Sequence, residues 1–148
     1  MSFKTALAAS IIAFAVAAPA IAQPTTAPTL YKRLGGYDAL AAVTDDFLAR
    51  LAADSGFARF FAGHSTDSIK RIRQNIVNQL CFATGGPCVY TGRDMKTSHA
   101  GLGITEKDWD VSVKLLVATL DKFNVPAKEK DEVLTTVSTL KKDIVEKP

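Results

Sequence analysis

The amino-acid sequence predicts an all-α protein, and two observations carry that prediction. Apolar residues recur at helical spacing in four long segments, whereas the alternation typical of strands does not occur after Gln23. Glycine and proline clusters separate the segments, because glycine permits left-handed backbone and proline cannot continue a helix. The long helices are expected at roughly 40–47, 69–80, 105–123 and 127–145.

The first long helix follows a short one near residues 30–34, and the pair Gly35-Gly36 divides the two. One face of this long helix is apolar, which predicts that it packs against a core. The apolar residues of that face are Leu40, Val43, Phe47, Leu48 and Leu51. An aromatic corner of Phe57, Phe60 and Phe61 follows the helix.

The second long helix is expected from about Ser68 to Ala83, with Asp67 or Ser68 as its cap. A Gly-Gly-Pro sequence that begins at Gly85 stops it. Its apolar face consists of Ile69, Ile72, Ile76, Val77 and Leu80.

The third long helix opens on Thr105-Glu-Lys-Asp108, which resembles a capping box with aspartate in the closing position. Pro126 opens the fourth helix in a favourable first-turn position. The third helix carries the apolar residues Trp109, Val113, Leu116, Leu120 and Phe123, and the fourth carries Val133, Val137, Leu140 and Ile144.

The N-terminal residues resemble a targeting segment rather than part of the fold. Residues 1–22 combine a basic start, an apolar run and a small-x-small end, which predicts a signal peptide cleaved before Gln23. An uncleaved membrane anchor is the alternative, but the run is short, is broken by Pro19 and has weak flanks. We therefore expect a flexible segment at 23–28, a domain at 29–148, and export to the periplasm or outside the cell without a stable membrane anchor.

Composition argues against a nucleic-acid partner. The formal net charge is +3, and removal of Lys4 lowers it by one. Basic and acidic residues are interspersed, and the single basic cluster at residues 70–73 has few aromatic neighbours. That cluster is expected to be a solvated helix face or a contact for an anionic ligand group.

Two cysteines flank the Gly-Gly-Pro loop. In an oxidising compartment Cys81 and Cys88 can pair and close a short loop. A buried free thiol at Cys81 is the alternative, since spacing alone does not give the geometry of a disulfide. Two cysteines are too few for a structural zinc site.

A single histidine follows the same loop. His99 lies on a short element between two long helices, where an imidazole can bind a metal or a haem iron from one side. Read alone, such a histidine is more often a surface or capping residue. The other histidine after residue 22, His64, lies in a corner that looks solvent-facing.

Several segments, in order, resemble the truncated haemoglobins, the two-over-two globin family, and most closely their group I. The segment 30–36 is similar to the opening motif of the family, and Asp46-Phe47 with Phe60-Phe61 resembles its aromatic pair. The segment 85–92 resembles the loop between its helices, and 95–104 the segment that carries its proximal ligand. The resemblance covers about residues 30–144 and implies a two-over-two helical sandwich.

The resemblance implies a haem cofactor whose iron is bound by His99. It also implies that Phe47 and Phe61 wall the haem slot, and that Tyr90 and Arg73 reach the propionates. Alternatives remain open for these residues. The two phenylalanines would be core residues in any helical domain, and Tyr90 can simply anchor its loop.

One departure from the family pattern concerns the wall opposite His99. Group I proteins commonly place there a tyrosine that donates its hydroxyl to bound oxygen, and Leu48 stands at that position. Ile72 and Ile76 match two positions that are often glutamine. The connection at 62–68 is about three residues longer than in familiar members, so a shifted register that brings a side-chain amide to this wall remains open. The amides concerned are Gln74, Asn75 and Gln79.

The resemblance implies a globin that reversibly binds a diatomic gas, namely oxygen, nitric oxide or carbon monoxide, with a role such as oxygen transport. An alternative is an enzyme that oxidises nitric oxide to nitrate, which needs stable bound oxygen and an electron donor or reductase. The apolar wall argues against efficient turnover, so a gas-binding protein is favoured over a dedicated enzyme. A haem-free helical module with an ordinary His99 is the third reading.

Overall fold

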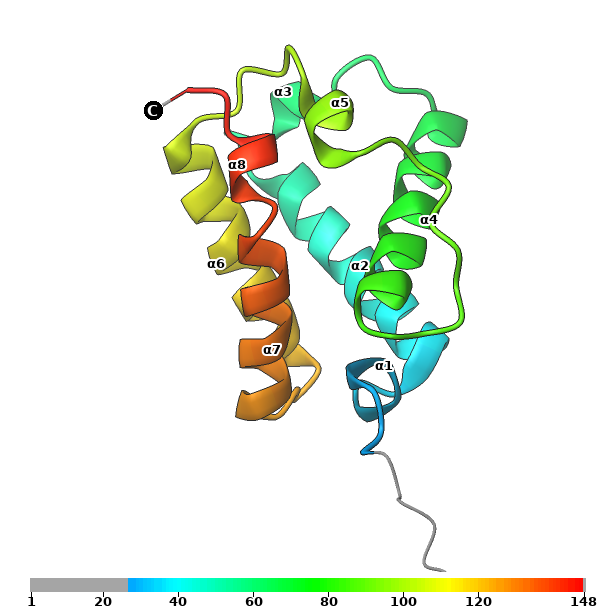
Figure 1. Ribbon diagram of the computed structural model, residues 1–148. Helices are drawn as coiled ribbons and strands as arrows, with labels where there is room; N and C mark the ends of the chain where they lie inside the picture. The colour runs from blue at the N-terminus through cyan, green and yellow to red at the C-terminus, as the bar shows by residue number, and fades with distance from the viewer. Residues whose placement is uncertain (1–26, 148) are drawn as a thin grey trace, which may run out of the picture.

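The computed structural model describes residues 27–147, and within them the chain is helical (Figure 1). The predicted signal peptide at 1–22 and residues 23–26 of the predicted flexible segment lie outside this range. The helices are α1 (Leu30–Arg33), α2 (Gly36–Ala53), α3 (Ala58–Phe61), α4 (Thr66–Ala83), α5 (Met95–His99), α6 (Glu106–Lys122), α7 (Ala127–Ser138) and α8 (Lys141–Ile144).

The four long helices form two pairs, which confirms the predicted two-over-two arrangement. Helix α2 packs against both α4 and α6, and α6 packs against α7 (Figure 1). A buried core of Val43, Leu116, Leu120 and Val133 joins α2, α6 and α7. Phe47 and residues of α1 pack against this core. Among residues 27–147, no helix is long and apolar enough to cross a membrane.

Side-chain caps fix where two of the long helices begin. Ser65, rather than Asp67 or Ser68, caps α4, and its hydroxyl accepts a hydrogen bond from the backbone N–H of Ser68. Helix α4 therefore begins at Thr66, two residues before the expected start. The capping box of α6 is present as predicted, with Thr105 and Asp108 exchanging hydrogen bonds.

The continuous last helix predicted at 127–145 is wrong, because the chain breaks after Ser138 into α7 and α8. The hydroxyls of Ser138 and Thr139 each donate to a carbonyl three residues earlier, at 2.7 Å. Such local bonds compete with the regular helix ladder, which weakens a serine- and threonine-rich segment. The break lets α8 pack against α5.

A mostly buried acidic residue of α2 ties this helix to α6. Asp46 Oδ2 lies 2.6 Å from Arg50 Nε, and Asp46 Oδ1 pairs with Lys122 of α6. Lys122 and Arg50 lower the pKa of Asp46 to about 2. A carboxylate with a lowered pKa stabilises the fold above its unfolded pKa, and this contribution disappears as pH falls through the folded value.

Asp46→Asn is therefore expected to lower the free energy of unfolding by about 1 kcal/mol at neutral pH, a figure that allows for the solvent exposure of Lys122. The difference between the wild type and this variant is expected to persist above pH 4 and to shrink toward pH 2. Urea unfolding at several pH values measures it. Asp67→Asn is the control, since that side chain is 79% exposed. A constant difference down to pH 2 would contradict the assignment.

Candidate functional site

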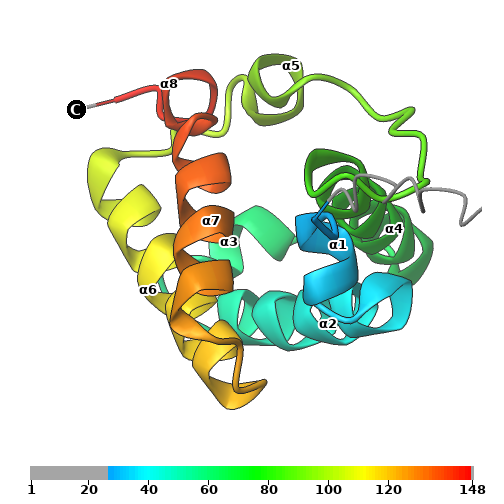
Figure 2. The same ribbon diagram turned by 60° about the horizontal axis from the view of Figure 1, so that its bottom comes forward.

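The short helix α5 is five residues long and ends at His99. Figure 2 shows it between the loop that follows α4 and the loop that leads to α6. Asp94 caps its first turn, accepting hydrogen bonds from the backbone N–H and the hydroxyl of Thr97, both at 2.8 Å. These bonds hold the pKa of Asp94 below its usual value, the backbone bond contributing most. The cap gives a very short helix a fixed start, and His99 is its last residue.

The ring of His99 is oriented by its own helix. Its Nδ1 lies 2.8 Å from the carbonyl oxygen of Met95, one turn earlier. Because a carbonyl only accepts, Nδ1 carries the proton in this contact and the neutral ring leaves Nε2 with a free lone pair. The half-buried imidazole is thus prepared to donate one bond to a metal.

Nε2 of His99 belongs to no cluster of protein metal ligands in the described part of the chain. Within residues 27–147, no three His, Cys, Asp or Glu side chains come together as a metal site. A single neutral imidazole instead suits a metal whose other ligands come from a macrocycle.

The apolar face of α4 would form the wall of the candidate site opposite His99. Ile72 and Ile76 are half-buried and share a face with Leu80 and Ala83, at spacings of four, seven, eight and eleven residues. Helix α4 packs mainly on α2, whereas the main packing partner of α5 is α8. A cleft of about 820 Å³ lies elsewhere, between the end of α4, α1 and α7, and neither His99 nor the two isoleucines line it. Its lining residues include Leu30, Ala83, Thr84, Glu132 and Thr136.

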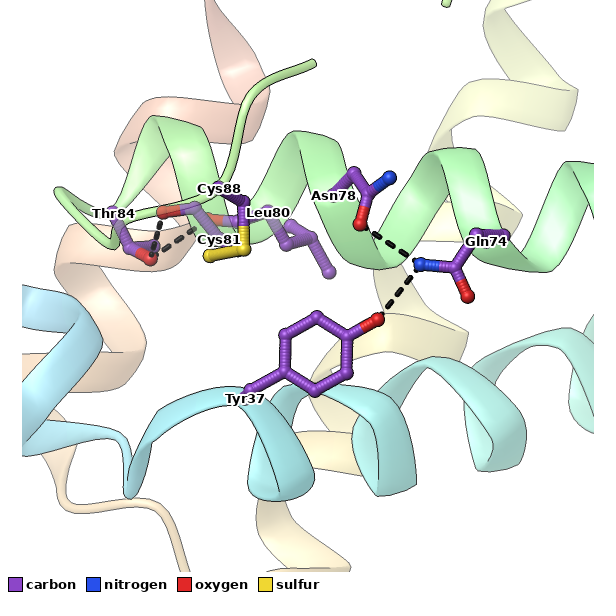
Figure 3. The surroundings of a disulfide bond; sticks show 7 residues. All are labelled: Tyr37, Gln74, Asn78, Leu80, Cys81, Thr84 and Cys88. Carbon is purple, nitrogen blue, oxygen red and sulfur yellow. Dashed lines mark hydrogen bonds between the residues drawn. A yellow bond between two sulfur atoms is a disulfide. The ribbon is translucent and has the colours of Figure 1, made fainter. Parts of the chain in front are cut away.

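The side-chain amides of α4 lie mostly away from this face. Gln74 is exposed, and its Nε2 donates to Tyr37 Oη at 2.7 Å and to Asn78 Oδ1 at 2.8 Å (Figure 3). Asn75 is exposed as well. Gln79 is half-buried and borders the apolar face two turns after Ile72. Of the three amides left open by the sequence, only Gln79 is half-buried.

The residues expected on α2 and α3 are half-buried. Leu48 shares a face of α2 with Thr44 and Leu51, both buried, at spacings of four and three residues. Phe47 packs against the core, and Phe61 ends α3. Arg59 of α3 donates to Asp108 Oδ2 at 2.8 Å, which ties the aromatic corner to the start of α6.

The two residues expected at the propionates make other contacts. The guanidinium of Arg73 pairs with the Asp45 carboxylate of α2, with Nη2 2.8 Å from Oδ2. Tyr90 Oη donates to the carbonyl oxygen of Arg93 at 2.6 Å, and partial burial raises the pKa of Tyr90. Tyr90 therefore contacts its own loop, and its expected role at the propionates, like that of Arg73, stays a prediction.

The structure pairs Cys81 and Cys88 in a disulfide (Figure 3). The loop it closes is tightly packed, because a Cβ at Gly86 would lie 2.6 Å from the Tyr31 ring and 2.7 Å from Cys81 Sγ. Cys81 is fully buried. The disulfide therefore fixes the end of α4 to the loop that leads to α5.

Sequence reasoning missed two polar contacts around α5 and α3. The first is the Asp94 cap. The sequence could have predicted it, because aspartate is a preferred capping residue that accepts a hydrogen bond from an N–H two or three residues later. The second is the Arg59–Asp108 pair, whose members lie 49 residues apart, so no local pattern announces it.

Comparison with known proteins decides the family. The sequence profile of the bacterial-like globins matches residues 29–146. The chain belongs to this family. Group 1 truncated haemoglobin GlbN of Nostoc commune is 35% identical over 119 residues, which are 80% of this chain and 98% of that protein. GlbN of Mycolicibacterium paratuberculosis is 33% identical over 116 residues, 78% of this chain and 83% of the relative.

Solved structures agree with this placement in the group 1 truncated haemoglobins. Truncated haemoglobin of Tetrahymena pyriformis in its Fe(III) form superposes with a TM-score of 0.73 at 27% identity, covering 80% of this chain and 98% of that one. The 2/2 haemoglobin of Synechococcus sp. PCC 7002 gives the same TM-score and coverage at 28% identity. This globin therefore has the two-over-two fold that the sequence predicted.

The disulfide of this globin gives a direct prediction. Replacing Cys81 and Cys88 by serine is expected to lower the free energy of unfolding by about 2 kcal/mol, because the bridge closes a short loop in the unfolded chain. In the wild type, reduction is expected to add about 2 Da to the intact mass, the two hydrogens gained by the thiols. A mass that reduction leaves unchanged would show free thiols instead.

Proposed function

We propose that this globin binds haem and reversibly binds a diatomic gas at iron held by His99. The observation that carries the proposal is the His99 ring itself, since the bond from Nδ1 to Met95 leaves Nε2 free to bind a metal. Family membership supports haem as the cofactor. The Synechococcus relative is described in a cyanomet state with covalently attached haem.

The residues around the site fit a large, flat, mostly apolar group. The half-buried isoleucines of α4 would cover one side of it and His99 the other, while Phe47 and Phe61 would contact its edge. When bound, haem supplies a ferrous iron that takes up the gas. Return of ferric iron to the ferrous state needs an electron donor, so a reductase is a proposed partner.

The distal wall proposed for this globin consists of Leu48, Ile72 and Ile76, none of which can donate a hydrogen bond. Bound oxygen carries partial negative charge and is stabilised by about 1–3 kcal/mol when a buried donor reaches it. Oxygen is therefore expected to dissociate quickly, whereas carbon monoxide and nitric oxide depend less on such a donor. This wall does not favour the nitric oxide-oxidising enzyme, which needs long-lived bound oxygen.

His99→Ala is expected to abolish normal haem incorporation, because no other histidine lies between the loop at 85–92 and α6. Added imidazole is expected to restore a haem spectrum by replacing the missing side chain. Visible absorption spectra of the purified variant, with and without imidazole, measure both effects.

His64→Ala is the matched control for this experiment. His64 is exposed, and its Nδ1 lies 2.9 Å from Ser68 Oγ at the start of α4. Its replacement is expected to leave the spectrum unchanged, whereas loss of a low-spin signature would identify it as a sixth iron ligand. A wild-type spectrum in His99→Ala would overturn the iron assignment.

Leu48→Tyr is expected to slow oxygen dissociation by about one to two decades, the effect of roughly 1–3 kcal/mol from one buried hydrogen bond. Carbon monoxide dissociation is expected to change much less, because that ligand carries less charge. Stopped-flow ligand replacement measures both rates.

Gln79→Leu tests the neighbouring amide in the same assay. If Gln79 only borders the site, its replacement leaves oxygen dissociation within about twofold of the wild type, the scatter expected for a surface change. Slow oxygen release in the wild type that Gln79→Leu accelerates would show a polar distal wall. That result would make the nitric oxide-oxidising enzyme the better proposal.

We also propose that this globin is exported, on the composition of residues 1–22. The Cys81–Cys88 disulfide is in keeping with an oxidising compartment. Mass spectrometry of protein recovered outside the cytoplasm is expected to find a chain that begins at Gln23. Recovery in the cytosol alone, with Met1 intact, would contradict export.

A further inference from the structure

A carboxylate far away in the sequence holds the backbone next to His99. Glu146 follows α8, and its Oε1 accepts a hydrogen bond from the N–H of Gly101 at 2.5 Å. Its Oε2 accepts from the N–H of Gly103, also at 2.5 Å. One side chain therefore spans the loop at 100–104, which begins directly after His99.

The loop is shaped to receive an anion. Gly101 and Gly103 have φ values of 81° and 65°, in the left-handed region that favours glycine. Left-handed residues in such a turn direct backbone N–H groups into a concave anion site. Hydrogen bonds to an ionised acceptor are stronger than neutral ones, and those from Gly101 and Gly103 lower the pKa of Glu146.

The segment that carries Glu146 is itself fixed to the start of α6. The N–H groups of Glu146 and Lys147 donate to the carbonyl oxygen of Ile104, at 2.9 and 3.2 Å. The N–H of Glu106 donates to the carbonyl oxygen of Lys147 at 3.2 Å. These backbone bonds hold the segment that carries Glu146 next to the loop at 100–104.

Helix α5 has few other restraints on its C-terminal side. The carbonyl oxygen of His99 accepts from the N–H of Leu102 at 3.2 Å, which belongs to the same loop. The packing partner of α5 is α8, the helix that leads to Glu146 (Figure 2). Asp94 fixes one end of the short helix, and the loop held by Glu146 fixes the other.

We propose that Glu146 is a positioning residue for the iron ligand. By binding Gly101 and Gly103 it fixes the loop after α5, and the loop fixes the direction of the His99 Nε2 lone pair. This inference rests on the proposed role of His99. Its consequence is a His–iron bond of one defined geometry and slow loss of haem.

The first readout is backbone protection in the haem-loaded protein. In Glu146→Ala, amide hydrogen exchange at Gly101 and Gly103 is expected to be at least about tenfold faster, since two charge-assisted bonds are lost. Glu146→Gln is expected to be intermediate, because its carbonyl oxygen accepts one bond while its amide group faces the other N–H. Glu106→Gln is the control of equal charge, since that carboxylate pairs with Lys141 and not with the loop.

The second readout is the His–iron stretching band in the resonance Raman spectrum of the ferrous, gas-free protein. Glu146→Ala is expected to shift or broaden this band and to speed haem transfer to an acceptor globin by about tenfold. Glu106→Gln is expected to change neither. A variant with faster exchange at the loop but an unchanged band would overturn the positioning role while leaving His99 as the ligand.

Absence of a His–iron band in the wild type would contradict the proposed function, and the positioning role with it. Hydrogen exchange still separates the two failures, because it reports whether Glu146 binds the loop regardless of what His99 binds. Unchanged exchange in Glu146→Ala would show that the loop does not depend on this carboxylate.

Discussion

The two helices proposed to enclose the haem have different main packing partners. Helix α4 packs on α2, and the short helix α5 packs on α8 (Figure 1). The isoleucines of α4 are half-buried, as is His99. A flat cofactor bound between the walls would bury these side chains, and a ligand that binds the native state alone stabilises it. The apolar side chains of the proposed site would therefore be fully buried only when the cofactor is bound.

The start of α6 contacts both the aromatic corner and the C-terminal segment that carries Glu146. Asp108 closes the capping box with Thr105 and accepts a hydrogen bond from Arg59, next to the aromatic corner. Lys147 joins the backbone of the same turn from the other side. Displacing this turn would disturb both the Arg59 contact and the segment that carries Glu146. A partly buried carboxylate with several donors is well suited to hold such a junction, because losing any donor leaves its charge less compensated.

Much of the fold follows from the sequence, because helix faces and caps are local signals. The stripe of isoleucines predicted α4, and Thr105 with Asp108 predicted the first turn of α6. The break after Ser138 was not predicted, because apolar spacing continues through Leu140 and Ile144 while serine and threonine hydroxyls interrupt the helix. The pairing of Cys81 with Cys88 was left open by the spacing, since only the packed loop settles it.

The candidate site was predicted less completely than the fold. His99 could be named from a resemblance, whereas the orientation of its ring depends on a backbone carbonyl that no pattern reveals. The contacts of Arg73 with Asp45 and of Glu146 with Gly101 join residues 28 and 45 positions apart. Long-range polar pairs of this kind follow from the packing of helices and leave no periodic trace in the sequence.

A crystal structure of the haem-loaded protein tests the central claim most directly. The account predicts one haem between α4 and α5, with His99 Nε2 bonded to iron and its Nδ1 still donating to Met95. On the opposite side, Leu48, Ile72 and Ile76 are expected to surround the gas position. Iron bound by another side chain, or a side-chain amide of α4 directly over the iron, would contradict it.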